Sequence, residues 1–393
     1  MKNKVAITGK MGGGYKSSIK QRESNLELFR IITMLLIVAH HFVVNSGLLD
    51  IIYENPTSSR SLFLLLFGAW GKTGINCFVL ITGYFMCKSH ITAKKFGKLF
   101  GEWMFYRIAI NCVFIIFDYQ TLSLKSFLKI IIPITAIATN FTSCFIIFWL
   151  LIPFLNVLVN NMTEKQHIRL LCLCSFTYVV LGTFHTVNMN YVTWFIVLYL
   201  MSSYIRLYHK KCFDNIILWG ILTFISFAIS AASVVCCAYF GKKFGINNAY
   251  FFVQDSNTLL AVTNSVCSFM FFKNIKIKHS KIINTIAAST FGVLLIHANS
   301  DTMRQWLWKD TLDNVGHYSI SLMPMYAIVC VLGVFAVCVV IDILRIHLIE
   351  KPFFKFWDKH WDKFFDWFNK KDTTFQEIKN TEFTRHKQKK KKS

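Results

Sequence analysis

The chain has 393 residues, of which 54% are hydrophobic and 16% aromatic, and its formal net charge is +23. This apolar content, with a mean hydropathy of +0.45, excludes an ordinary soluble domain and indicates a polytopic membrane protein. The basic residues gather in the tails and between the apolar stretches. They therefore reflect membrane topology and attraction to anionic lipids, and they argue against a nucleic-acid partner.

Ten stretches are long and apolar enough to cross a bilayer, so the sequence predicts an all-α membrane fold. A basic tail (1–25) precedes the membrane domain (26–347), in which segment 126–139 is expected to lie in the interface or to re-enter the bilayer. An amphipathic interfacial helix with an aromatic face (348–371) and a basic disordered tail (372–393) follow it. The ten predicted spans are 26–45, 64–87, 99–117, 142–160, 168–184, 191–208, 215–239, 256–272, 281–298 and 322–345.

Lysine and arginine are unequally distributed between alternate connections. With the N-terminus inside, 33 of them lie on the cytosolic side and seven outside, and without the C-terminal tail the ratio is 19 to seven. Because this bias sets orientation, both termini are predicted to be cytosolic. Three basic residues remain inside the spans or at their edges and are candidates for function, namely Arg30, Lys72 and Arg107.

The first apolar stretch carries two polar side chains at membrane depth, Arg30 and His41. On a straight helix they lie within about 20° of one face and about 16 Å apart, whereas His40 points about 80° to the side of Arg30. Polar groups at such depth usually mark function, which makes both residues candidates. The alternative is that Arg30 extends to the headgroups and His41 only bonds to a neighbouring helix.

Further polar residues extend this candidate site. In the second stretch Gly74 and Gly83 permit close helix packing. In the third, Arg107 is expected either to join Arg30 in binding an anion or to act as an inner-leaflet anchor. Glu102 is expected to face another helix or a ligand. Four side chains of the second stretch are predicted to line a cavity, namely Lys72, Asn76, Thr82 and Tyr84.

The end of the membrane domain adds one candidate. His297 is predicted at the outer end of the ninth stretch as a substrate-side contact, and it shares a face with Asp301 if the helix continues. Glu350 is expected to be an anchor at the inner interface. The twelve cysteines form no C-x-x-C pair, and we predict neither a metal site nor a bound cofactor.

Five segments in order resemble the acyltransferase-3 family of integral-membrane O-acyltransferases. The similarity rests on Arg-x10-His, as Arg30 to His41, and on the stretch GINCFVLITGY in the second span. It is supported by LLIPFLN in the fourth span, by STFGVLLIH ending at His297, and by IEKP after the last span. Thr82 stands where the family usually has serine, a change that keeps the hydroxyl.

The resemblance implies a ten-helix enzyme that moves an acyl group, commonly acetyl from acetyl-coenzyme A, to a hydroxyl of a cell-surface or lipid-linked glycan. Arg30 and Arg107 would then bind the acyl-coenzyme A donor, and His41 would act as general base or as acyl carrier. The expected partners are this donor, the glycan acceptor and membrane lipids, and the expected location is the cell membrane. The alternative class is a transporter or flippase for a glycan or lipid-linked intermediate.

The charge bias generates a first prediction. A reporter fused after Ser393 is expected to be cytosolic and a reporter inserted near Asn188 external, because basic connections stay on the inner side. Protease protection of both reporters in sealed vesicles measures this. An external Ser393 reporter would contradict the ten-span topology.

Overall fold

The computed structural model describes residues 23–121, 123, 128, 130, 140–185 and 187–358, and every regular element in them is a helix. Most of the tail 1–25, most of segment 126–139, the second half of the predicted interfacial helix and the tail 372–393 therefore lie outside the described residues. In chain order the elements are α1 (Ser24–Val44), α2 (Leu48–Glu54), α3 (Ser59–Gly68), α4 (Gly71–Met86), α5 (Ala93–Ile116), α7 (Phe141–Asn161), α8 (Glu164–Cys174), η2 (Ser175–Leu181), α9 (Gly182–Phe184), α10 (Tyr191–Leu207), η3 (Lys211–Asp214), α11 (Ile216–Phe244), α12 (Leu259–Asn274), α13 (Lys281–Ala288), α14 (Thr290–His297), α15 (Asp301–Arg304), η4 (Gln305–Thr311), α16 (Met323–Arg345) and η5 (Ile346–Glu350).

Each of the ten predicted spans falls on a helix, but fewer of these helices have the length of a span. Among the described residues, seven helices are long and apolar enough, or eight if the bent pair Lys281–His297 and Asp301–Thr311 forms one span. The predicted spans 191–208 and 256–272 correspond to α10 and α12, with 17 and 16 residues. Both are shorter than the roughly 20 residues that a bilayer requires, and much of each is buried against neighbouring helices.

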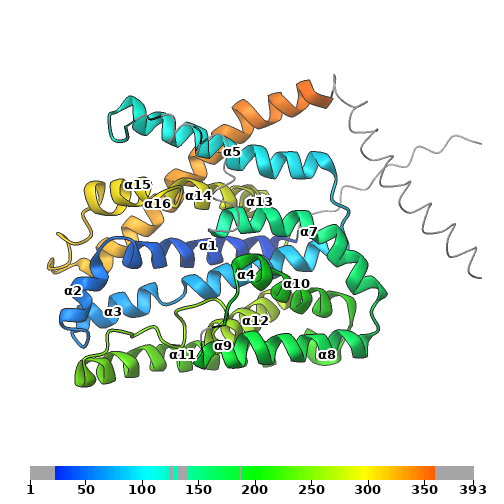
Figure 1. Cartoon of the computed structure of the whole chain (residues 1–393), viewed down its shortest axis with the longest axis horizontal. Coiled ribbons are helices and arrows are strands. Elements are labelled where there is room, and N and C mark those ends of the chain that lie inside the picture. The colour runs from blue at the N-terminus through cyan, green and yellow to red at the C-terminus, as the bar shows by residue number, and fades with distance from the viewer. Residues whose placement is uncertain are drawn as a thin grey trace, which may run out of the picture.

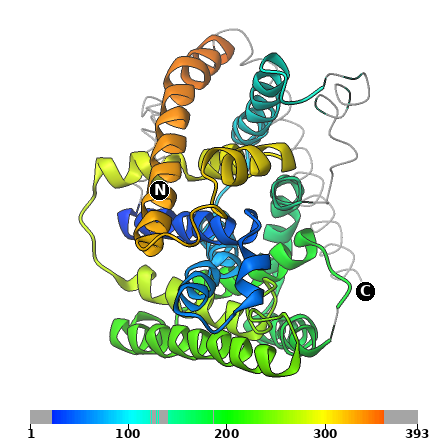
Figure 2. The same cartoon turned by 90° about the vertical axis from the view of Figure 1, so that its left-hand side faces the viewer.

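Helix α1 is the centre of the bundle. It packs against α3, α4, α12, α13, α14 and α16. Figure 1 shows it in the middle of the molecule, with α14 and α16 on one side and α11 beyond α3 and α4 on the other. In the view turned by 90°, α1 and the orange helix α16 again lie side by side (Figure 2), although they come from opposite ends of the described chain. The predicted first span is therefore the helix around which the others assemble.

Side-chain caps fix where several helices begin. Asn140 and Ser143 form a reciprocal capping box at the start of α7, in which each side chain bonds to the other residue's backbone N–H. Asn190 and Thr193 do the same at the start of α10. Such caps satisfy backbone donors that the first helical turn leaves free, so they set the helix starts.

Glycines allow α4 to approach its neighbours closely, as the sequence predicted. A Cβ at Gly74 would lie 2.8 Å from the carbonyl oxygen of Thr33 in α1. A Cβ at Gly83 would overlap the hydroxyl of Ser202 in α10 and lie 3.2 Å from the Cα of Tyr199. Close backbone approach of this kind is frequent in membranes. The hydrophobic effect does not drive helices together there, and small residues allow van der Waals packing instead.

Two features near the end of the domain could not be read from the sequence. The helix does not continue past His297, because a new helix, capped by Ser300, begins at Asp301 after a bend of 94°. Asp301 pairs with Arg304 at 2.7 Å instead of sharing a helix face with His297. Helix α16 runs on without a break through η5 to Asp358, so the described part of the predicted interfacial helix continues the last span.

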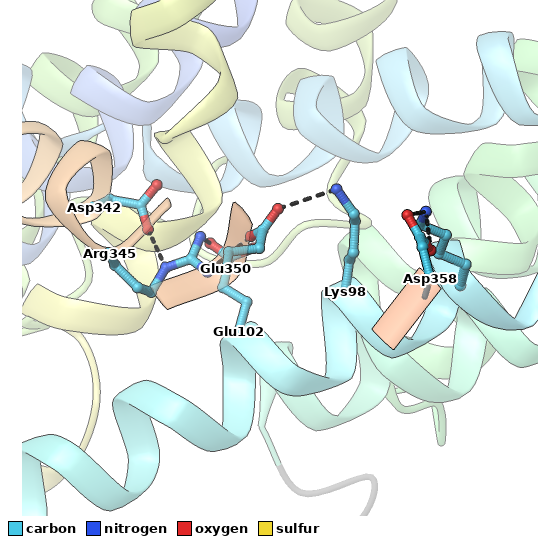
Figure 3. Close-up of polar contacts among 7 residues, drawn as sticks. Lys98, Glu102, Asp342, Arg345, Glu350 and Asp358 are labelled. Atoms are coloured by element: carbon cyan, nitrogen blue, oxygen red, sulfur yellow. Dashed lines mark hydrogen bonds and ion pairs between the residues drawn. The ribbon is translucent and has the colours of Figure 1, made fainter. Parts of the chain in front are cut away.

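A buried ionic network joins α5 to α16 (Figure 3). Arg345 bonds to Asp342 through Nε at 2.8 Å and to Glu350 through Nη1 at 2.8 Å, and it pairs with Glu102 of α5 through Nη2 at 3.3 Å. Lys98 of α5 adds an ion pair of 3.2 Å to Glu350. Glu102 thus has the partner on another helix that the sequence predicted. Glu350, expected as an anchor at the inner interface, takes part in the same network.

The network supports a prediction about stability. Arg345→Met leaves three carboxylates without their common cation, so we expect it to lower the free energy of unfolding by about 3–5 kcal/mol. The measurement is thermal unfolding of the purified protein in detergent.

The matched control is Lys94→Met, which breaks the ion pair with Asp358 visible in the same view (Figure 3). Because those side chains are 41% and 45% exposed, the loss should stay below about 1 kcal/mol. Equal effects of both substitutions would contradict a stabilising role of the buried network.

Candidate active site

Two histidines from different helices form the polar centre of the bundle. Nδ1 of His41 in α1 lies 3.0 Å from Nε2 of His297 in α14, and the ring centroids are 5.1 Å apart. His297 is fully buried, and its ring edge also faces Trp308. The structure therefore brings together two residues that are 256 positions apart in the sequence and that were predicted separately.

The second nitrogen of His297 defines the direction of this hydrogen bond. Nδ1 of His297 lies 2.6 Å from the carbonyl oxygen of Val293, and because a carbonyl only accepts, this nitrogen carries the proton. In a neutral His297, which burial favours, Nε2 then accepts the proton of His41 Nδ1. Nε2 of His41 keeps its lone pair and makes no hydrogen bond to any residue that the structure describes. His41 is thus held as the tautomer that suits a base or a nucleophile.

His40 is held in a different place. Its Nδ1 donates to the carbonyl oxygen of Gly68 at 2.6 Å. Its ring fills the space above Gly71, where a Cβ would overlap the imidazole. Both contacts join α1 to the α3–α4 corner, so the geometry of His40 is that of a packing residue.

Arg30 lies about three turns before His41 on the same helix. Its Nη1 lies 4.0 Å from Glu27, and its guanidinium carbon lies 5.7 Å from the ring centroid of Phe78 in α4. The ring of Phe78 in turn stacks with Phe291, one and a half turns before His297. Aromatic surface therefore connects the guanidinium of Arg30 to the helix that carries His297.

Two contacts of Arg107 lie within α5 and with the segment that follows it. Its Nε donates to the carbonyl oxygen of Ile130 at 3.0 Å, and its guanidinium lies 5.8 Å from the ring of Trp103 in its own helix. Helix α5 packs mainly against α7 and α14. A shared anion site of the two arginines remains a prediction.

Lys72 and Asn76 lie on the face of α4 that meets α10. Lys72 donates to the hydroxyl of Tyr191 at 3.1 Å, near the His41 end of the bundle. The amide of Asn76 is engaged on both sides, since it donates to Ser256 at 2.6 Å and accepts from Trp194 at 2.8 Å. Asn76 thus ties the chain before α12 to α10, and its amide is occupied by protein groups.

The other end of α4 contains a residue that sequence reasoning missed. Arg206 in the last turn of α10 donates to the hydroxyl of Tyr84 at 2.7 Å and lies 4.5 Å over its ring. In the sequence, Arg206 lies near the end of the predicted span 191–208, beside the basic residues of the following connection. Thr82, on the same segment, bonds to the carbonyl of Phe78 in its own helix.

The described residues contain no group of three histidine, cysteine or acidic side chains arranged to hold a metal ion.

The chain matches the family described as an acyltransferase domain over residues 23–343, which includes every candidate residue named above. No curated protein and no solved structure matches the chain.

The contact of His40 with Gly71 yields a stability prediction. Gly71→Ala forces the His40 ring out of its position, so we expect a loss of about 1–3 kcal/mol in unfolding free energy from overpacking. The same change at Gly101, which has open space around it, should be neutral or stabilising by up to about 1 kcal/mol. Thermal unfolding in detergent compares the two.

A double variant tests the cause. Adding His40→Ala to Gly71→Ala should cost less than the two single effects combined, because the clash is then absent. Strict additivity would show that Gly71 does not act through His40.

Proposed function

Since the chain belongs to the acyltransferase-3 family, we propose that it transfers an acetyl group from acetyl-coenzyme A to a hydroxyl of a cell-surface or lipid-linked glycan. Family membership makes it a membrane acyltransferase, and its seven or eight candidate spans make it a multi-pass protein. The donor, the acceptor and the location in the cell membrane are our proposal.

The observation that carries this proposal is the contact of His41, on the helix that also holds Arg30, with His297 of α14. The pair leaves Nε2 of His41 as a lone-pair nitrogen inside an apolar bundle. Acyl transfer to a hydroxyl needs such a group, because an alcohol is a weak nucleophile until its proton is removed.

In the direct mechanism, Nε2 of His41 takes the proton of the sugar hydroxyl while the oxygen attacks the thioester carbonyl. The carbon–sulfur bond breaks, the ester forms, and the proton passes from His41 to the departing thiolate of coenzyme A. His297 orients the imidazole and accepts a stronger hydrogen bond from His41 while that ring is positively charged. His297 is therefore a positioning residue in this mechanism.

In the two-step mechanism, Nε2 of His41 attacks the thioester first, and the acetyl group is carried on His41 before it passes to the sugar. The same free nitrogen suits both mechanisms. Incubation with acetyl-coenzyme A alone distinguishes them, since only the two-step mechanism leaves an acetylated peptide that includes His41.

Arg30 is the proposed donor-binding residue. Coenzyme A is a polyanion, and a guanidinium binds phosphate with two parallel hydrogen bonds. Arg30 lies at the end of α1 predicted to be cytosolic, and the roughly 16 Å to His41 suits an extended pantetheine arm. Arg206 with Tyr84 lies at the same end of α4 and α10, and we add it to Arg107 as a second candidate for phosphate contacts.

A transporter or flippase is the competing class, because it also needs polar side chains in a membrane cavity. Membership of an acyltransferase family over most of the chain favours the enzyme. Consumption of acetyl-coenzyme A by the purified protein separates the two classes directly.

The histidines give the sharpest test. His41→Gln removes the free ring nitrogen, so we expect the transfer rate to fall by on the order of 10² or more at unchanged protein level. His40→Gln keeps a side-chain donor for the carbonyl of Gly68 and should retain most activity. The measurement is acetylated glycan formed per unit of membrane-inserted protein.

Both substitutions are isosteric in length and lie at nearly the same depth, so each controls for the packing cost of the other. Wild-type activity in His41→Gln would rule out the catalytic role of His41. Selective loss in His40→Gln would assign that role to its neighbour.

A further inference from the structure

A cavity of about 500 Å³ lies beside the His41 end of α4 and α10. One wall comes from the chain between η2 and α10, with lining residues in 182–185 and 187–191. The other wall comes from residues within 251–257, before α12. This size falls within the roughly 300–1,000 Å³ typical of small-molecule sites. We propose that this cavity, called the acceptor pocket below, binds a neutral sugar residue of the acceptor glycan. The inference rests on the proposed function.

Hydrogen bonds hold the two walls in place. The side chain of Asn257 donates to the carbonyl of Tyr178 at 2.8 Å, and the hydroxyl of Thr183 accepts from the backbone N–H of Leu259 at 2.8 Å. Asn76 of α4 holds the carbonyl of Ser256 at 2.6 Å. The pocket is therefore formed before a ligand arrives, which reduces the entropy lost on binding.

The lining has the chemistry that a sugar requires. Gln254 and Asp255 present an amide and a carboxylate that can bond to hydroxyl groups, and Tyr191 and Phe251 offer rings for the apolar face of a pyranose.

The pocket is connected to the histidine pair through α4. Tyr191, which lines the pocket, accepts the hydrogen bond of Lys72. The residue before Lys72 is Gly71, whose backbone lies against the ring of His40, next to His41. Asp255 contributes a carboxylate to the lining, which repels an anionic ligand. An uncharged sugar matches this lining.

The test uses purified full-length protein, acetyl-coenzyme A and methyl glycosides of neutral hexoses as acceptor probes. We expect acetylated glycoside to form with saturable dependence on the sugar. In Gln254→Ala and in Asp255→Asn, the KM for the glycoside should rise about tenfold, while the KM for acetyl-coenzyme A stays within about twofold. Both residues are exposed, so these variants should fold.

The control is Arg60→Ala, which alters a second hollow of about 450 Å³ away from the pocket and should leave both KM values unchanged. Unchanged glycoside KM in both pocket variants overturns the proposal, as does acetyl-coenzyme A turnover with no glycoside accepted. A parallel rise in both KM values also overturns it, because the residues would then act on the whole site. If wild-type protein does not turn over acetyl-coenzyme A at all, the proposed function itself has failed.

Discussion

A polar side chain inside an apolar helical bundle must find a partner, because neither lipid nor an apolar core supplies one. This constraint explains the arrangement around α1. His41 reaches His297, His40 reaches the carbonyl of Gly68, and the second nitrogen of His297 reaches its own helix. One ring nitrogen of His41 is left over once these bonds are made. The hydrogen bond that satisfies Nδ1 of His41 therefore also leaves its Nε2 with a lone pair.

The same constraint produces the network that holds the last helix in place. Arg345 is almost completely buried and is surrounded by the carboxylates of Asp342, Glu102 and Glu350. Asp342 also fills the space beside Gly292 in α14, where a Cβ would overlap its carboxylate. Helix α14, which carries His297, is therefore packed against the network, and this contact lies about one and a half turns before His297. The family resemblance includes both ends of this arrangement, STFGVLLIH and IEKP.

Several polar residues have surroundings that the sequence of their own helix does not predict. Asn76 was predicted to line a cavity, but its amide is occupied by Ser256 and Trp194. Arg206 stands in the sequence beside a basic connection, yet it lies over the ring of Tyr84 in α4. Asp301 would share a face with His297 if the helix continued, but a new capped helix turns the chain by 94° between them. In each case the deciding partner belongs to a distant segment or to a bend that periodicity does not record.

The sequence by itself determined the helical membrane class, the positions of the ten helical segments, and the stripe of α1 that carries Arg30 and His41. These follow from hydropathy and from the fixed geometry of a helix, which are local properties. Only the tertiary structure decided that His41 pairs with His297, because the two residues lie 256 positions apart, and the tautomer of His297 depends on a carbonyl in α14. It also decided where the acceptor pocket lies, since two connections far apart in the chain form its walls. Contacts across the bundle arise from packing and hydrogen-bond satisfaction between segments, and no single stretch of sequence contains them.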